Sequence, residues 1–348
     1  MTTANGRVLV VGGRGAVGSV VRGTLERWFP GRVVTAGRSP GGHGAPGAPH
    51  GPGVPGVRAD VTDAEGFRRA LDGLGDLAAV VLCVQPPDTG PATACLERGI
   101  HLVDVNAEPD LMRRTTGLDG LADAAGATAV LSVGLAPGLT NLLAGRAHHA
   151  LGGADRLELT VLLGSGERHG ADAVRWTVEA LTEPPGDARP RRVALPGHGR
   201  RTARPFPFSD QHTLPGTLGV PEVTTRLCLD SRLSTGLLFA LRPAARHPAL
   251  RRALTSMLLR THLGGDAFAV RADAWRDGRH AALALTGRGQ GRVSGLVAAH
   301  TTREVLAGRL PTGVRHLEQL PALADLPERL APDGVVLHPL RSTVSRRS

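Results

Sequence analysis

A cluster of glycines close to the N-terminus has the spacing needed to bind phosphates. Residues 8–18 read Val-Leu-Val-Val-Gly-Gly-Arg-Gly-Ala-Val-Gly, so an apolar run leads directly into the glycines. Residues 17–28 then carry apolar side chains at helical spacing. A strand, a glycine-rich turn and a helix in this order are typical of dinucleotide binding. The glycines let the backbone approach a pyrophosphate, and the helix N-terminus offers unpaired N–H groups to it.

The glycines fit two spacings of this pattern, and an ordinary glycine-rich turn is the competing interpretation. The spacings are Gly13-x-Gly15-x-x-Gly18 and Gly12-x-x-Gly15-x-x-Gly18, and the sequence leaves both open. We therefore predict that the whole turn contacts the cofactor; it comprises Gly12, Gly13, Arg14, Gly15, Ala16 and Val17.

The end of the next strand indicates which dinucleotide binds. Residues 32–36 read as a short strand, and Gly37, Arg38 and Ser39 follow it. An acidic residue at this point would bind the 2′-hydroxyl of NAD, whereas an arginine accommodates the 2′-phosphate of NADP. Arg38, with Ser39 as a further phosphate partner, therefore predicts NADP(H) as the cofactor.

Later strand ends supply the other cofactor candidates, because the carboxyl ends of parallel strands meet at one edge of a sheet. We expect Asp60 and Val61 to border the adenine. The remaining candidates lie further along the same edge and are Val84, Gln85 and Asn106.

Asp104 is the candidate catalytic residue. It lies at the carboxyl end of a predicted strand, residues 101–105, near the expected position of the nicotinamide. A carboxylate there can stabilise an iminium or orient a proton-carrying water. A helix cap or a hydrogen bond to a nearby loop is the competing interpretation.

Candidates for the substrate side come from later in the chain. Leu139 and Thr140 begin a predicted helix whose N-terminus can hold a carboxylate. His169 and Trp176 are candidates from the second half, although such residues are more often packed or solvated. Three arginines that can clamp carboxylates are left unranked by the sequence: Arg175, Arg226 and Arg242. No metal site is predicted, because no ligand spacing occurs.

Two residue types are absent, and their absence limits the chemistry. The chain has no tyrosine, and all 41 of its Lys+Arg residues are arginine. Reactions that need a Tyr-Lys pair or a Schiff-base lysine are therefore excluded. Short-chain dehydrogenases often use such a pair on a domain of this kind.

The first part of the chain alternates strands with helices, which predicts a doubly wound parallel Rossmann sheet and hence an α/β fold. Residues 40–56 form a low-complexity loop rich in glycine and proline. The expected strands are 8–11, 32–36, 57–61, 79–84, 101–105 and 129–133, and the expected helices are 17–28, 64–74, 91–98 and 111–125.

The second part predicts an α+β domain with a mainly antiparallel sheet. Its expected strands are 157–163, 267–272 and 281–286, its expected helices are 170–181, 246–263 and 293–306, and residues 184–221 read as a long connection. We expect a turn at Asp277-Gly278 between the last two strands. The predicted division is a Rossmann domain over 1–138, a substrate and dimerisation domain over 139–340 and a disordered tail over 341–348.

Composition narrows the function classes. A net charge of +10 would suit nucleic acid, but the basic residues are spread along the chain and only 3% of residues are aromatic, so no nucleic-acid partner is expected. There is no apolar run of about 18 residues and no signal peptide, so we expect no membrane partner. Three cysteines without metal or redox spacing suit a reducing cytoplasm.

Three segments resemble the saccharopine dehydrogenase (saccharopine reductase-like) family. Residues 95–104, Cys-Leu-Glu-Arg-Gly-Ile-His-Leu-Val-Asp, are similar to its Cys-x-x-x-Gly-x-His-Tyr-x-Asp segment. Residues 134–141, Gly-Leu-Ala-Pro-Gly-Leu-Thr-Asn, are similar to its Gly-x-Asp-Pro-Gly-x-x-Asn crossover, and residues 313–318 to its C-terminal return segment. Leu102 and Ala136 depart from the pattern, where the family carries a tyrosine and an aspartate.

The resemblance implies an NADPH-dependent oxidoreductase that reduces an imine (C=N) bond, or as a variant a C=C bond. The departures argue against saccharopine itself and favour a small carboxylate or a specialised metabolite as substrate. The resemblance also implies a homodimer. The missing tyrosine and lysine suit this chemistry, because an iminium already carries its proton when the hydride arrives.

Two alternatives remain open. One is an atypical short-chain-like reductase of ketones or quinones. The other is a catalytically inactive NADP-binding protein, which the apolar residues Leu102 and Ala136 would suit.

Overall fold

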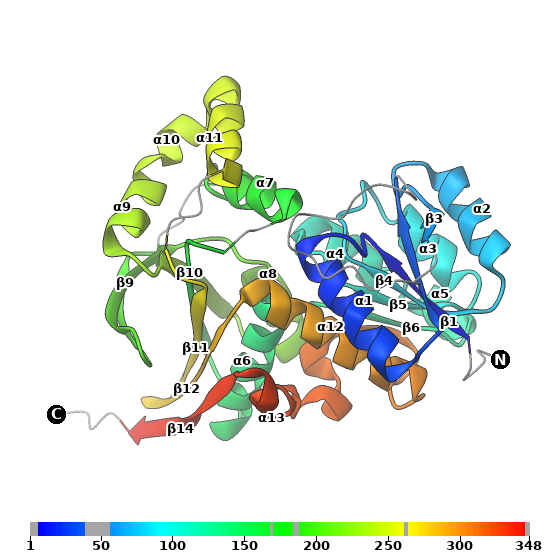
Figure 1. The fold of residues 1–348 in the computed structure, drawn as a ribbon. Coiled ribbons are helices and arrows are strands. Elements are labelled where there is room, and N and C mark those ends of the chain that lie inside the picture. Colours follow the sequence, from blue (N-terminus) through cyan, green and yellow to red (C-terminus); the bar gives the residue numbers. More distant parts are fainter. Residues whose placement is uncertain (1–5, 39–55, 168–169, 184–187, 261–263, 345–348) are drawn as a thin grey trace. The chain divides into compact units, whose positions relative to one another are not determined.

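The computed structural model describes residues 6–38, 56–167, 170–183, 188–260 and 264–344 (Figure 1). The chain divides into two compact units. Unit 1 comprises residues 1–134 and 291–324, and unit 2 comprises residues 135–290 and 325–348.

The described residues of unit 1 form a seven-stranded sheet with the order β13-β6-β5-β4-β1-β2-β3. Every neighbouring pair is parallel. The strands are β1 (Arg7–Val11), β2 (Val33–Gly37), β3 (Gly56–Arg58), β4 (Leu77–Leu82), β5 (His101–Asp104), β6 (Thr128–Leu131) and β13 (Gly313–His316). The chain order reverses between β1 and β4, and in such sheets ligands bind outside the carboxyl ends at this point.

Helices cover both faces of this sheet, which explains why β4 is buried at all six positions. One face packs against α2 (Ala64–Leu74), α3 (Gly90–Leu96), α4 (Pro109–Thr116) and α5 (Asp119–Ala124). Figure 1 shows α1 (Ala16–Trp28) and α12 (Gln290–Leu306) together on the opposite face. Two short 3₁₀ turns follow β13, η2 (Leu317–Gln319) and η3 (Pro321–Leu323).

Unit 2 holds a second seven-stranded sheet within its described residues, with the order β14-β12-β11-β7-β10-β9-β8. Its central pair, β7 and β10, is parallel and the other neighbouring pairs are antiparallel. The strands are β7 (Arg156–Leu163), β8 (Arg191–Leu195), β9 (Gly199–Pro205), β10 (Glu222–Leu229), β11 (Ala267–Arg276), β12 (Arg279–Arg288) and β14 (Val336–Val344). The predicted turn at Asp277-Gly278 joins β11 to β12, with positive φ at both residues.

The described helices of unit 2 are α6 (Thr140–Ala150), α7 (Ala171–Ala180), α8 (Asp210–Leu218), α9 (Arg232–Ala240), α10 (Arg242–Ala245), α11 (Pro248–Arg260), α13 (Leu326–Arg329) and η4 (Ala331–Asp333). The segment η1 (Leu135–Leu139) before α6 is a kinked turn, because Ala136, Pro137 and Gly138 have non-helical backbone angles. The predicted fold class, a parallel Rossmann sheet with a second, mainly antiparallel sheet, is confirmed. No helix in the described part of the chain is both long and apolar enough to cross a membrane.

Four predictions about chain organisation were wrong. Residues 191–218, within the expected long connection, form the hairpin β8-β9 and helix α8. The hairpin lies at the edge of the sheet, and many residues of β8 and β9 are exposed. It therefore contains few apolar residues, and its sequence resembles that of a loop. The expected helix over 111–125 is broken near Gly117 into α4 and α5.

The other two concern the C-terminal part of the chain. Residues 341–344 do not belong to a disordered tail, because β14 continues through Val344 alongside β12. Residues 291–324 also lie outside the expected continuous second domain, since β13 pairs with β6 in the sheet of unit 1. Strands that pair over such long distances in the sequence produce no local sequence pattern that would reveal the pairing.

A pair of helical glycines tests how closely α12 packs on α1. A Cβ at Gly295 would lie 2.7 Å from the Val20 Cβ and 2.9 Å from the Val17 carbonyl oxygen, whereas a Cβ at Gly23 would meet nothing within 4 Å. We expect Gly295→Ala to lower the free energy of unfolding by about 1–3 kcal/mol through overpacking. The control Gly23→Ala should raise it by about 0.5–1 kcal/mol. Urea unfolding measures both, and equal effects of the two substitutions would contradict the close packing.

Candidate functional site

The turn between β1 and α1 has the geometry of one of the two predicted glycine spacings. Gly12 has a φ of +79°, and its carbonyl oxygen accepts the Gly15 N–H at 2.9 Å. A Cβ at Gly12 would lie 2.6 Å from the Val84 Cγ1, and a Cβ at Gly18 would overlap the Gly12 carbonyl. The tight turn, the helix start and the close helix packing thus fall at Gly12, Gly15 and Gly18.

The N-terminus of α1 is open. Gly15 caps the helix without a side-chain hydrogen bond, and no acidic residue lies in the first turn. Gly15 and Ala16 are exposed, whereas Arg14 and Val17 are half-buried. Gly13 is buried, and a Cβ there would lie 2.8 Å from the Thr35 Cγ2. Free N–H groups at the start of a helix without nearby acids form a site that suits a phosphate.

At the next strand end, Arg38 is exposed directly after β2, and Ser39 lies outside the described residues. Asp60 follows β3, and its Oδ1 accepts the Thr62 N–H at 3.0 Å and the Thr62 hydroxyl at 2.8 Å. These hydrogen bonds lower the pKa of Asp60, and the charges of Arg38 and Arg58 lower it further. Arg38 therefore lies close enough to this carboxylate to act on it electrostatically.

Asp104 ends β5 and is 3% exposed. Its Oδ1 accepts the Asn106 N–H at 2.9 Å, but burial outweighs this bond and raises the pKa of the carboxyl to about 7. A carboxyl group that is partly protonated at neutral pH can both donate and accept a proton.

Two thiols lie near enough to Asp104 for its charge to affect their pKa values. Burial, with a smaller contribution from Asp104, raises the pKa of Cys83 to about 12. Burial likewise raises the pKa of Cys95 to about 12, and the charge of Asp104 adds to this effect. Both thiols stay protonated at neutral pH, so neither is an activated nucleophile.

Asn106 has an unused hydrogen-bond donor beside Asp104. Its Oδ1 accepts the Glu108 N–H at 3.2 Å, while its Nδ2 is buried and has no partner among the described residues. Glu108 itself caps α4 by accepting the Leu111 N–H at 2.6 Å. Buried donors are usually satisfied, so an acceptor from a ligand fits the Asn106 amide. Further candidates at this edge are Val61 and Val84, both half-buried, and Gln85, which is exposed.

A serine and a histidine at the same edge were missed by the sequence reasoning. Ser132 follows β6 with a φ of 56°, and its Oγ lies 2.8 Å from the Nδ1 of His316, the last residue of β13. The His316 Nε2 lies 3.4 Å from the Thr116 hydroxyl. Burial lowers the pKa of His316, so the ring is neutral at pH 7. Only the parallel pairing of β6 with β13 brings these residues together, and no sequence motif joins them.

The substrate candidates lie in unit 2. Leu139 is fully buried, and Thr140 is buried with its hydroxyl donating to Asp210. Trp176 packs edge-on against Phe206, with ring centroids 5.6 Å apart. His169 lies outside the described residues. Asp104 belongs to unit 1, so Leu139, Thr140 and Trp176 are not in the same unit as Asp104.

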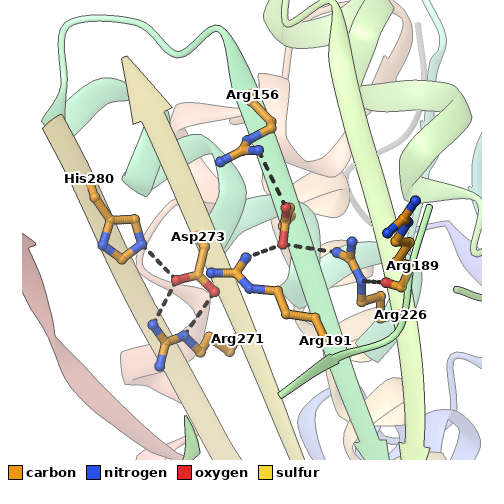
Figure 2. Close-up of polar contacts among 8 residues, drawn as sticks. Arg156, Arg189, Arg191, Arg226, Arg271, Asp273 and His280 are labelled. Carbon is orange, nitrogen blue, oxygen red and sulfur yellow. Dashed lines mark hydrogen bonds and ion pairs between the residues drawn. The ribbon is translucent and has the colours of Figure 1, made fainter. Parts of the chain in front are cut away.

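The structure separates the three arginine candidates. Arg175 pairs with Asp172 in the same helix. Arg226 is buried and donates to Glu158 at 2.9 Å, and Figure 2 shows it beside Arg191, which also binds Glu158. Arg242 forms no ion pair with a described residue and lines two cavities of unit 2. Among the residues that the structure describes, no three His, Cys, Asp or Glu side chains gather as a metal site would require.

Replacing Asp104 with asparagine tests its burial. We expect the wild-type protein to lose stability relative to Asp104→Asn as the pH rises from about 4 to about 7, and the difference to stay constant above that. The pKa is raised from 3.8 to about 7, so the charged form is disfavoured by folding. The full difference is roughly 4 kcal/mol at most. Urea unfolding between about pH 4 and pH 8 measures it.

The exposed Asp110 of α4 provides the control. Because Asp110 is exposed and accepts a hydrogen bond from Arg113, the wild type should not lose stability relative to Asp110→Asn over the same pH range. Absence of such a loss relative to Asp104→Asn would contradict the raised pKa of Asp104.

No protein-family model and no curated protein match this chain. Among solved structures it is similar to the WlbA (WbpB) dehydrogenase from Thermus thermophilus, in complex with NAD and UDP-GlcNAcA, at 16% identity and a TM-score of 0.41 over 99% of this chain and 97% of that one. A myo-inositol dehydrogenase from Corynebacterium glutamicum is similar at 12% identity and a TM-score of 0.39 over 96% and 99% of the two chains.

A short chain dehydrogenase from Burkholderia cenocepacia, in complex with NADP, is similar at 15% identity and a TM-score of 0.28 over 37% of this chain and 73% of that one. At these identities and scores the similarities carry no argument about this chain. Its fold and its site rest on its own geometry.

Proposed function

We propose that this chain is an NADPH-dependent oxidoreductase of the saccharopine dehydrogenase-like type. Its reaction is the reduction of a C=N bond, or as a variant a C=C bond, in a small carboxylate or specialised metabolite. The observation that carries the proposal is the glycine turn at the switch point between β1 and β4, with Asp104 two strands from β1 along the same edge.

The residues at this edge fit a dinucleotide. Contacts with Val84 and with the Gly12 carbonyl leave no room for a Cβ at Gly12 or Gly18, as a close packing of strand, turn and helix requires. The open start of α1 suits the pyrophosphate. The unpartnered Asn106 Nδ2 suits an acceptor on the nicotinamide half. When bound, the reduced cofactor supplies a hydride.

In this proposal Asp104 transfers the proton to the substrate. With a pKa of about 7, its carboxyl group can protonate an imine before the hydride arrives. The resulting carboxylate then stabilises the iminium until it is reduced. A ketone reductase is the second candidate, because the same protonated carboxyl can donate to a developing alkoxide. The chain has no tyrosine and no lysine to supply that proton instead.

Arg38 tests the choice of cofactor. We expect the wild-type protein to bind NADPH more tightly than NADH, and Arg38→Gln to weaken NADPH binding about 10-fold or more while leaving NADH binding unchanged. The substitution removes the guanidinium group that would donate a charged hydrogen bond to the 2′-phosphate of NADPH. Fluorescence titration measures both affinities. Arg27→Gln removes the same charge at the far end of α1 and should change neither.

Equal affinities of the wild-type protein for NADPH and NADH would contradict the role of Arg38. Absence of saturable binding of either cofactor would overturn the proposed function.

The bond that is reduced can be tested with matched substrates. We expect NADPH oxidation with cyclic imines and little with the corresponding ketones, and a loss of about 10²–10⁴-fold in kcat for Asp104→Asn through the missing proton transfer. The kcat of the wild type should fall as the pH rises through about 7, where Asp104 loses its proton. Turnover of ketones but not imines would favour the second candidate. Tight NADPH binding without any turnover would indicate a catalytically inactive protein.

A further inference from the structure

Three arginines of unit 2 line one cavity. The cavity has a volume of about 380 Å³. It is lined by Arg204 from β9, by Arg242 at the start of α10 and by Arg246 just after α10. No Asp or Glu among the described residues lines it, and none of the three arginines forms an ion pair with a described residue. We call it the arginine cavity.

Two of these guanidinium groups share one aromatic ring. The Cζ atoms of Arg204 and Arg242 lie 5.8 Å and 5.6 Å from the centroid of Phe239 in α9. The ring holds both charges near each other, since each is attracted to its face. Burial lowers the pKa of Arg242, and the charges of Arg246 and Arg204 lower it further, against a smaller opposing effect of Glu183. Like charges are thus gathered here at an electrostatic cost.

Arg242 is anchored so that part of its guanidinium group stays unused. Its Nε donates to the Leu181 carbonyl at 3.1 Å. Its Nη2 is buried and has no hydrogen-bond partner among the described residues. A guanidinium group presents its donors as a planar fork that matches a carboxylate or a phosphate. The unused donor therefore points to an anionic ligand.

Arginines of the second sheet have acidic partners: the buried Arg226 and the half-buried Arg156, Arg191 and Arg271 each pair with a carboxylate. Figure 2 shows Arg156, Arg191 and Arg226 around one carboxylate, that of Glu158. Figure 2 also shows Arg271 and His280 on Asp273, at 2.7 Å and 2.8 Å. An acid accompanies the arginines in both of these places, whereas no described Asp or Glu lines the arginine cavity.

We propose that the arginine cavity binds a small organic anion. Arg204, Arg242 and Arg246 hold its carboxylate or phosphate group. Its apolar part lies against Phe239 and three prolines of the lining, Pro190, Pro205 and Pro243. The volume is within the range of small-molecule sites, and an apolar wall with a few convergent charges is their usual composition.

The test uses the full chain, without cofactor, and two anionic probes that separate the sources of charge. Isophthalate carries carboxylates and phenyl phosphate carries a phosphate; isophthalamide is the neutral analogue of the first. We expect calorimetry at low ionic strength to show saturable binding of at least one anion and none of the amide. Arg242→Gln and Arg204→Gln should each weaken that binding about 10-fold or more.

Arg252→Gln is the matched control, because it removes an exposed charge from α11 that does not line the cavity. It should leave the affinity unchanged. Thermal unfolding establishes whether each variant is folded. Arg204 is exposed, so Arg204→Gln should stay folded and keeps the test valid even if Arg242→Gln unfolds. Absence of saturable anion binding, equal binding of isophthalamide, or equal loss in Arg252→Gln would overturn the proposal. A failure of NADPH to bind would leave it standing, because the titration contains no cofactor.

Discussion

Unit 1 depends on how closely helix α1 approaches the backbone on its two sides. At its start, Gly18 lies against the Gly12 carbonyl, and Gly12 in turn lies against Val84 of the neighbouring strand end. Along its length, Gly295 of α12 lies against Val17 and Val20. A side chain at Gly12 or Gly18 would push the start of α1 away from the sheet, and one at Gly295 would push α12 and α1 apart. The free N–H groups of α1 would then no longer face the carboxyl edge at the switch point.

Burial has opposite consequences for the acids of the two units because their surroundings differ. Asp273 is buried, but hydrogen bonds from His280 and Arg271 outweigh the burial and lower its pKa. Asp104 is as deeply buried and receives one backbone N–H, so its pKa rises to about 7. Asp273 therefore stabilises cations, whereas Asp104 can exchange a proton at neutral pH. The arginines differ in the same way, since Arg226 forms an ion pair with Glu158, whereas the Nη2 of Arg242 has no hydrogen-bond partner among the described residues.

Much of unit 1 could be predicted because its signals are local. Helix α2 was predicted at its observed bounds, since its apolar spacing and its cap at Asp63 lie within a dozen residues. The hairpin β8-β9 was missed because its exposed arginines hide the strand pattern. Strand β13 was missed because its partner β6 is far away in sequence. The candidate site followed the same rule: Asp104 and Asn106 were found at a strand end, whereas the contact of Ser132 with His316 needs β13 in place.

The sequence by itself determined the parallel sheet, the glycine turn, the polar groups at its edge and the absence of tyrosine and lysine. Each of these is a property of residue type and short spacing. The tertiary structure decided the conformation of the glycine turn, the burial of the Asp104 carboxyl away from any described cation, and which of the described arginines have an acid beside them. These depend on the surroundings of a side chain, and those surroundings come from strands and helices that are distant in sequence.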